Sequence, residues 1–113
     1  MNHAIAKQWV AALRSGQYKQ TTGALRNGDS FCCLGVLCNL HAIAHPKIAR
    51  KEVNPIMYLG MGGTLPYEVR TWAGMFTKTR RIPDFNETLA FLNDDGSTFD
   101  EIAAVIEKNV KQL

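Results

Sequence analysis

The sequence predicts an α+β fold, with about four helices packed on a small β-hairpin or short antiparallel sheet. Two observations predict this class. Apolar residues recur at helical spacing in several separate segments, and an Asn27-Gly28 dipeptide lies where a tight hairpin turn would form. At 113 residues the chain can bury a modest core without cross-links, so we expect a single domain over residues 1–113.

The first predicted helix covers residues 3–15. Ile5, Trp9 and Leu13 recur at four-residue spacing and would form its apolar face. Asn2 stands where a capping side chain would accept a hydrogen bond from the first turn.

A β-hairpin is predicted next, over residues 23–32. Its turn is the Asn-Gly dipeptide, which tolerates the positive φ angles of a tight turn. The register stays open. A two-residue loop would pair Arg26 with Asp29, whereas a three-residue loop would pair Leu25 with Phe31.

Residues 33–44 predict a buried helix, because apolar side chains occur on nearly every face. Pro46 would end it. The segment that follows is irregular, with one short strand at residues 56–59. A second short helix is predicted for residues 64–74, where a proline suits the first turn and a glycine ends the helix.

The type of the short apolar segment at residues 89–92 stays open, but a C-terminal helix is clearly predicted. Ser97 would cap this helix, with Asp100 completing an acidic variant of the capping box. We also expect Glu107 and Lys111 to pair at i,i+4 spacing. The predicted core stripe consists of Phe99, Ile102, Ala103, Ile106, Val110 and Leu113.

All three cysteines fall within residues 32–38, and zinc is the first chemistry to consider. Cys33, Cys38, His41 and His45 form a C-x4-C-x2-H-x3-H series. Zinc requires four ligands in a tetrahedron, whereas one helix presents ligands along a line, and the spacing matches no common zinc finger. We therefore expect Cys33 and Cys38 to be core residues, and we assign no metal and no cofactor.

A cysteine nucleophile is the second possibility, because a helix N-terminus lowers the pKa of a thiol. That chemistry also needs a histidine base within hydrogen-bond reach. His41 and His45 lie further along the same predicted helix, which leaves only His3. The sequence therefore favours a protein that is not an enzyme.

The positive charge is concentrated in the first half of the chain. Residues 1–53 carry seven Lys/Arg and two Asp/Glu, against six and eight in residues 54–113. A basic region attracts phosphates, guanidinium forks suit phosphate oxygens, and aromatic rings can stack on bases. Tyr18 and Gln20 would lie on one side of an extended segment. The candidate ligand-binding residues are Arg14, Tyr18, Lys19, Gln20, Arg26, Arg80 and Arg81.

The sequence has no run of about 18 apolar residues, so we expect no membrane span. Its first residues lack a basic segment followed by an apolar core, so we also expect no signal peptide. Without export the thiols should be reduced, as they are in a cytosol, and an odd number of cysteines disfavours a closed disulfide set.

Three motifs together resemble a family of small uncharacterised proteins of tailed bacteriophages and prophages. They are a W-x3-L-R-S-G-x-Y-x-Q opening at residues 9–20, the F-C-C-L-G-V-L-C run at residues 31–38, and an L-N-D-x-G close at residues 92–96. Residues 65–72 extend the likeness, and residues 44–63 lie outside it. The resemblance implies a protein that works in the cytoplasm of an infected host bacterium. The resemblance identifies no catalytic residue.

Two functions are consistent with these observations. The first is a non-enzymatic protein that sequesters a small phosphate-bearing molecule, such as a nucleotide signal of host defence. It needs only a concave polar site, often at a subunit junction, so a homo-oligomer is one expected form. The second is an interaction protein that binds a host macromolecule, either a protein or a nucleic acid.

Overall fold

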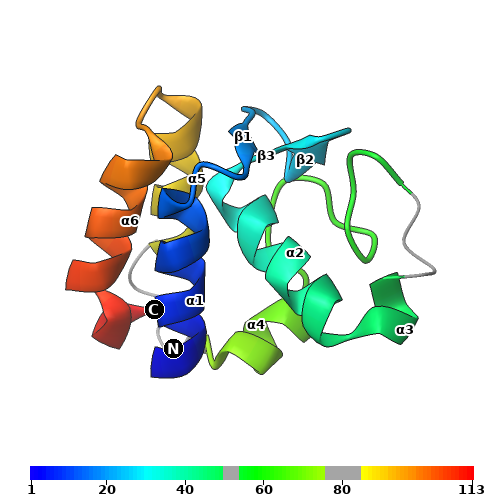
Figure 1. Cartoon of the computed structure of the whole chain (residues 1–113), viewed down its shortest axis with the longest axis horizontal. Helices are drawn as coiled ribbons and strands as arrows, with labels where there is room; N and C mark the ends of the chain where they lie inside the picture. Colours follow the sequence, from blue (N-terminus) through cyan, green and yellow to red (C-terminus); the bar gives the residue numbers. More distant parts are fainter. Residues whose placement is uncertain (50–53, 76–84) are drawn as a thin grey trace.

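The computed structural model describes residues 1–49, 54–75 and 85–113. Over these residues the chain forms six α-helices, a three-stranded mixed sheet and a short 3₁₀ helix (Figure 1). The α+β class is confirmed, but the expected number of about four helices was too low. The elements are α1 (His3–Arg14), β1 (Lys19–Gln20), β2 (Arg26–Asn27), β3 (Ser30–Phe31), α2 (Cys33–Ala44), α3 (Pro46–Ala49), α4 (Tyr67–Ala73), α5 (Phe85–Asp94), α6 (Phe99–Lys108) and η1 (Val110–Gln112).

Side-chain caps define the start of the two helices that begin and end the fold. As predicted, Asn2 caps α1, its Oδ1 accepting from the Ile5 N–H at 3.1 Å. The predicted cap of α6 was wrong by one residue. Thr98 is the cap, and Glu101 accepts from the Thr98 N–H at 2.9 Å in a complete capping box. A glutamate at the third helical position can reach back to the cap, which explains this choice.

The sheet has a register that neither predicted alternative describes. In the antiparallel β2–β3 pair Arg26 faces Phe31 and Asn27 faces Ser30, so the loop is Gly28-Asp29. Gly28 adopts φ 60°, which glycine reaches without strain. β1 adds to the other edge of β3 in parallel, which makes the sheet mixed rather than antiparallel.

Helix α2 occupies the centre of the molecule, as its continuous apolar sequence predicts. Cys33, Leu34, Val36, Leu37 and Cys38 are all buried. The hairpin lies directly against the first turn of α2. A Cβ atom on the glycine at position 35 would come 1.7 Å from the backbone oxygen of residue 25, so only glycine allows this approach.

The region after α2 differs from the sequence expectations in several places and decides one question that the sequence left open. Pro46 begins the short helix α3 as well as following the end of α2. The strand expected at residues 56–59 is only an isolated bridge between Tyr58 and Met61. Residues 89–92, whose type was open, belong to α5. The helix predicted for residues 64–74 forms as the shorter α4 (Tyr67–Ala73), with Pro66 at the N-cap instead of in the first turn and Gly74 at the C-cap.

Asn93, at the end of α5, joins three segments of the chain. Its Oδ1 accepts from Gln20 Nε2 at 2.9 Å and from the buried N–H of Cys33 at 3.1 Å. Its Nδ2 donates to the Thr21 carbonyl at 2.8 Å. The Cys33 carbonyl in turn accepts from Trp9 Nε1 at 2.9 Å. The three sequence motifs therefore meet at one polar junction, which gives Trp9, Gln20, Cys33 and Asn93 a structural role.

Candidate functional site

The three thiols are buried, and none of them forms a disulfide. Cys32 caps α2, its sulfur accepting from the Gly35 N–H at 3.4 Å, and Cys33 Sγ donates to the Leu89 carbonyl at 3.5 Å. Burial raises the pKa of all three thiols, and the effect on Cys32 outweighs the hydrogen bonds from the start of the helix. Neutral, buried thiols are poor nucleophiles and poor metal ligands. The expectation that Cys33 and Cys38 lie in the core is confirmed.

The two histidines of the C-x4-C-x2-H-x3-H series stack on each other, with ring centroids 4.2 Å apart. His41 Nδ1 hydrogen-bonds the Tyr58 hydroxyl, and His45 Nδ1 hydrogen-bonds the His41 carbonyl, both at 2.8 Å. Trp72 packs edge-to-face against both rings. Within residues 1–49, 54–75 and 85–113, no three His, Cys, Asp or Glu side chains are grouped so that they could hold a metal ion.

Several residues of the predicted ligand-binding set are engaged in holding the fold together. The Tyr18 hydroxyl accepts from Asn39 Nδ2 at 2.7 Å, and its ring packs edge-on against Phe31. Gln20 Nε2 donates to Asn93 and to the Ser97 carbonyl. Tyr18 and Gln20 therefore bind different helices.

Arg26 also has a structural role, because its guanidinium donates to the carbonyls of Asn54 and Met57 and so ties the loop before α4 to the sheet. Lys19 is exposed on β1. Arg80 and Arg81 lie outside the described residues. Of the predicted set, Arg14 lines a cavity wide enough for a small molecule.

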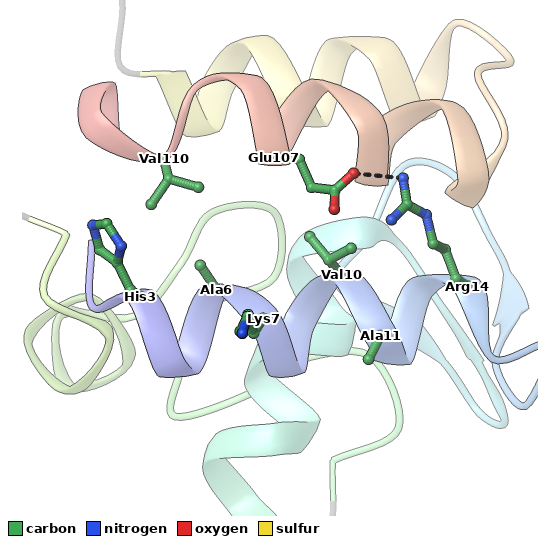
Figure 2. Close-up of a pocket in the computed structure, with 8 residues that line it drawn as sticks. All are labelled: His3, Ala6, Lys7, Val10, Ala11, Arg14, Glu107 and Val110. Carbon is green, nitrogen blue, oxygen red and sulfur yellow. Dashed lines mark hydrogen bonds and ion pairs between the residues drawn. The ribbon is translucent and has the colours of Figure 1, made fainter.

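This cavity is a groove between α1 and the C-terminal end of the chain, with a volume of about 410 Å³. α1 and α6 pack side by side through their apolar faces, and the hollow follows the exposed edge of that contact (Figures 1 and 2). A volume of this size falls within the range of small-molecule sites. The residues that line this α1–α6 groove are His3, Ala6, Lys7, Val10, Ala11, Arg14, Glu107 and Val110.

Helical spacing places the basic residues of the groove. His3, Lys7 and Arg14 follow each other at four- and seven-residue intervals, so they lie along one side of α1. The small side chains of Ala6, Val10 and Ala11 lie between them in Figure 2. The groove therefore combines a basic rim with an apolar floor.

Arg14 and Glu107 form an ion pair across the groove, with Nη2 and Oε1 2.7 Å apart (Figure 2). The hydrogen bond between them raises the pKa of Arg14 and lowers that of Glu107. Both side chains remain substantially exposed, at 41% and 53%. Ion pairs exposed to this degree are weak, so an anion could replace Glu107 beside the guanidinium at little cost.

A second hollow, of about 460 Å³, adjoins the groove and shares His3, Glu107 and Val110 with it. Its other lining residues are Lys108, Asn109 and Lys111. The predicted pair between Glu107 and Lys111 does not form, because Glu107 turns to Arg14 and α6 ends before residue 111. Together the two hollows are lined by four Lys or Arg side chains and a single carboxylate.

Residues 1–110 match a domain of unknown function, DUF8296. The chain belongs to the DUF8296 family. The match covers α1, the sheet, all of α6 and the residues that line the groove up to Val110. No curated protein and no solved structure matches this DUF8296 chain.

Sequence reasoning found Arg14 but missed the other basic residues of this DUF8296 groove. The spacing of His3 and Lys7 ahead of Arg14 was the available signal on α1. No sequence pattern links His3, Lys7 and Arg14 with Lys108 and Lys111. These two lysines lie near α1 only because α1 and α6 pack together. Among the described residues, no helix has the length and apolar character needed to cross a membrane.

Proposed function

We propose that this protein is a non-enzymatic binding protein that holds a small phosphate-bearing molecule in the α1–α6 groove. The observation that carries the proposal is the groove itself, where Arg14 and Lys7 stand over an apolar floor. In a phage-infected bacterium, the setting that the motif resemblance implies, such a molecule would be a nucleotide signal of host defence.

The chemistry of the groove fits a phosphate ester better than a neutral ligand. Arg14 offers a planar fork of donors that matches two phosphate oxygens. Its present partner, Glu107, is an exposed carboxylate and can be displaced. Lys7 adds a second cation one helical turn from the groove's His3 end.

The floor of the groove suits the uncharged part of such a molecule. Val10 is buried and Val110 is half-buried, and with Ala6 and Ala11 they form the apolar part of the lining. Small-molecule sites typically combine an apolar lining with a few polar groups that fix orientation. A sugar or base could lie on this surface while the phosphate contacts Arg14.

The thiols and Glu107 favour binding over chemistry. The thiols are buried with raised pKa values, and the pKa of Glu107 is lowered by Arg14. A general base works best when its pKa lies near the operating pH, so Glu107 is a weak one.

The proposal is tested by titrating the isotope-labelled protein with adenosine monophosphate and following amide shifts by NMR. We expect changes concentrated at Lys7, Arg14, Glu107 and Val110. Arg14→Gln should weaken binding by about tenfold or more, because charge-assisted hydrogen bonds are lost. Shifts that are scattered over the surface, or absent at millimolar ligand, would refute the groove as the site.

Two further variants separate binding from folding. Glu107→Gln removes the carboxylate that competes for Arg14, so it should tighten binding, a gain that damage to the fold cannot produce. Lys7→Gln should weaken binding, whereas the matched change Lys19→Gln should not, because Lys19 is an exposed lysine that does not line the groove.

An interaction protein is the second candidate, and two exposed aromatic side chains favour it. Tyr67 on α4 is 77% exposed and Phe91 on α5 is 65% exposed. Aromatic residues are enriched at protein interfaces. Under this alternative, Tyr67→Ser or Phe91→Ser would abolish capture of a defined host protein and leave binding of adenosine monophosphate unchanged.

A further inference from the structure

The basic residues around the groove are not gathered at one point. His3 and Arg14 lie at opposite ends of α1, roughly 16 Å apart along a helix of this length. Figure 2 shows these two side chains at the two ends of the groove, with Lys7 between them. The second hollow shares His3 with the groove and adds Lys108 and Lys111. The C-terminus lies at the His3 end of α1, because the Met1 amino group donates to the Leu113 carbonyl at 2.8 Å.

The lysines of the second hollow are free to bind a ligand. Within the part of the chain that the structure describes, neither Lys108 nor Lys111 forms an ion pair. The usual role of cations at a helix C-terminus is to bind its last carbonyls. Here Asn109 already does this for one of them, its Nδ2 donating to the Val105 carbonyl at 2.7 Å.

The apolar residues between the two basic ends of the site determine which chemical group could link two anionic groups of one ligand. Val110 lines both hollows, and Ala6 and Val10 line the floor towards Arg14. A single phosphate can contact the basic residues at only one end of the site. A molecule with an anion at each end of an apolar or planar body would satisfy both ends and cover the floor.

We infer that the groove and the second hollow form one extended site for a ligand with two separated anionic groups, one bound by Arg14 and the other by Lys108 and Lys111. This inference rests on the proposed function, because it specifies the ligand class of the same site. It favours dinucleotides and bisphosphorylated molecules over mononucleotides. Lys7, midway along α1, would contact the connecting part of the ligand.

The test uses the purified full chain and isothermal titration calorimetry with bisphosphates of ethane, octane and dodecane diols. Octyl phosphate is the control, because it has the apolar chain and only one anionic end. We expect the octane or dodecane bisphosphate to bind about tenfold or more tightly than octyl phosphate, since the second contact becomes intramolecular. The ethane compound, too short to span the site, should bind like inorganic phosphate.

Paired variants assign each end of the site. Arg14→Gln and Lys111→Gln should each reduce the affinity for the long bisphosphate to that for octyl phosphate. Lys111→Gln should leave the affinity for inorganic phosphate unchanged, whereas Arg14→Gln should weaken it. Lys19→Gln is the matched control for a lost surface charge.

The possible failures point to different errors. Equal affinity for octyl phosphate and every bisphosphate, with Arg14 still required, would refute the two-ended site and leave the proposed function standing. If inorganic phosphate, octyl phosphate and the bisphosphates all fail to bind, the proposed function itself is refuted. Binding that depends on chain length but not on Lys111 would place the second anion elsewhere and would also overturn the inference.

Discussion

Replacing Asn93 with alanine removes the side chain that joins β1, α2 and α5. Asn93 is fully buried and makes three hydrogen bonds that bring these segments together. The change leaves the buried N–H of Cys33 without its acceptor and the Thr21 carbonyl without its donor. Gln20 keeps a second acceptor, the Ser97 carbonyl, so its loss is smaller.

The expected loss of stability follows from the two backbone groups that lose their hydrogen-bond partners. A buried polar group without a partner, here the Cys33 N–H, costs about 1–3 kcal/mol, and the partly buried Thr21 carbonyl costs less because water can reach it. With a small cavity cost for the lost amide, the free energy of unfolding should fall by roughly 2–5 kcal/mol, out of the 5–15 kcal/mol typical of a domain. For a chain of this size the melting temperature should fall by more than about 10 °C.

Urea unfolding followed by tryptophan fluorescence measures this loss, because Trp9 is buried and hydrogen-bonded to the Cys33 carbonyl. Asn109→Ala is the matched control. It removes one partly buried hydrogen bond to the Val105 carbonyl and should cost about 1 kcal/mol or less. Equal effects of the two substitutions would show that Asn93 is not a junction and would refute the reasoning.

The remaining predictions concern packing, pH and reactivity. Gly35→Ala should lower the free energy of unfolding in urea by more than about 3 kcal/mol, because overpacking alone costs about 1–3 kcal/mol and here the new carbon would overlap the Leu25 carbonyl. Gly63→Ala, with open space around it, should be close to neutral. Equal losses of stability in the two variants would contradict the close approach of Gly35 to Leu25. Burial and the charge of His45 lower the pKa of His41 in the folded protein, and Glu68 opposes this effect, so the unfolded chain takes up the proton at a higher pH than the folded chain does. The contribution of His41 to stability should therefore be constant above about pH 6.5 and fall as the pH drops below it. Melting curves of His41→Gln should lack this pH dependence. The three native thiols should react with a maleimide only as fast as the protein opens, and rapid labelling at pH 7 would contradict their burial.

Local pattern was enough to predict the main helices of this protein. The spacing of Ile5, Trp9 and Leu13 predicted α1, and the capping role of Asn2 is met by its bond to Ile5. The continuous apolar run predicted that α2 would be buried. These features depend on side chains within a few residues of each other, so the sequence displays them directly.

The candidate site was only partly predictable, because its parts come from distant segments. Arg14 was found from its residue type, but its pairing with Glu107 joins positions 93 residues apart. Tyr18, Gln20 and Arg26 have the residue types of a phosphate site, and each of them also binds a neighbouring element of the fold. Residue type alone does not separate a side chain that binds a ligand from one that holds a loop in place.

The sequence by itself predicted α1, α2, α4 and α6, placed the caps of α1 and α6 to within one residue, and identified the cysteine run as apolar core, but it did not predict α3 and left the type of residues 89–92 in α5 open. The tertiary structure alone decided the parallel addition of β1 to β3, the Gly28-Asp29 loop and the meeting of α1 with α6 that forms the groove. The physical reason is the separation along the chain of the residues that decide each feature. Helix periodicity and capping depend on neighbours one turn away, whereas sheet register and grooves depend on which distant surfaces bury each other.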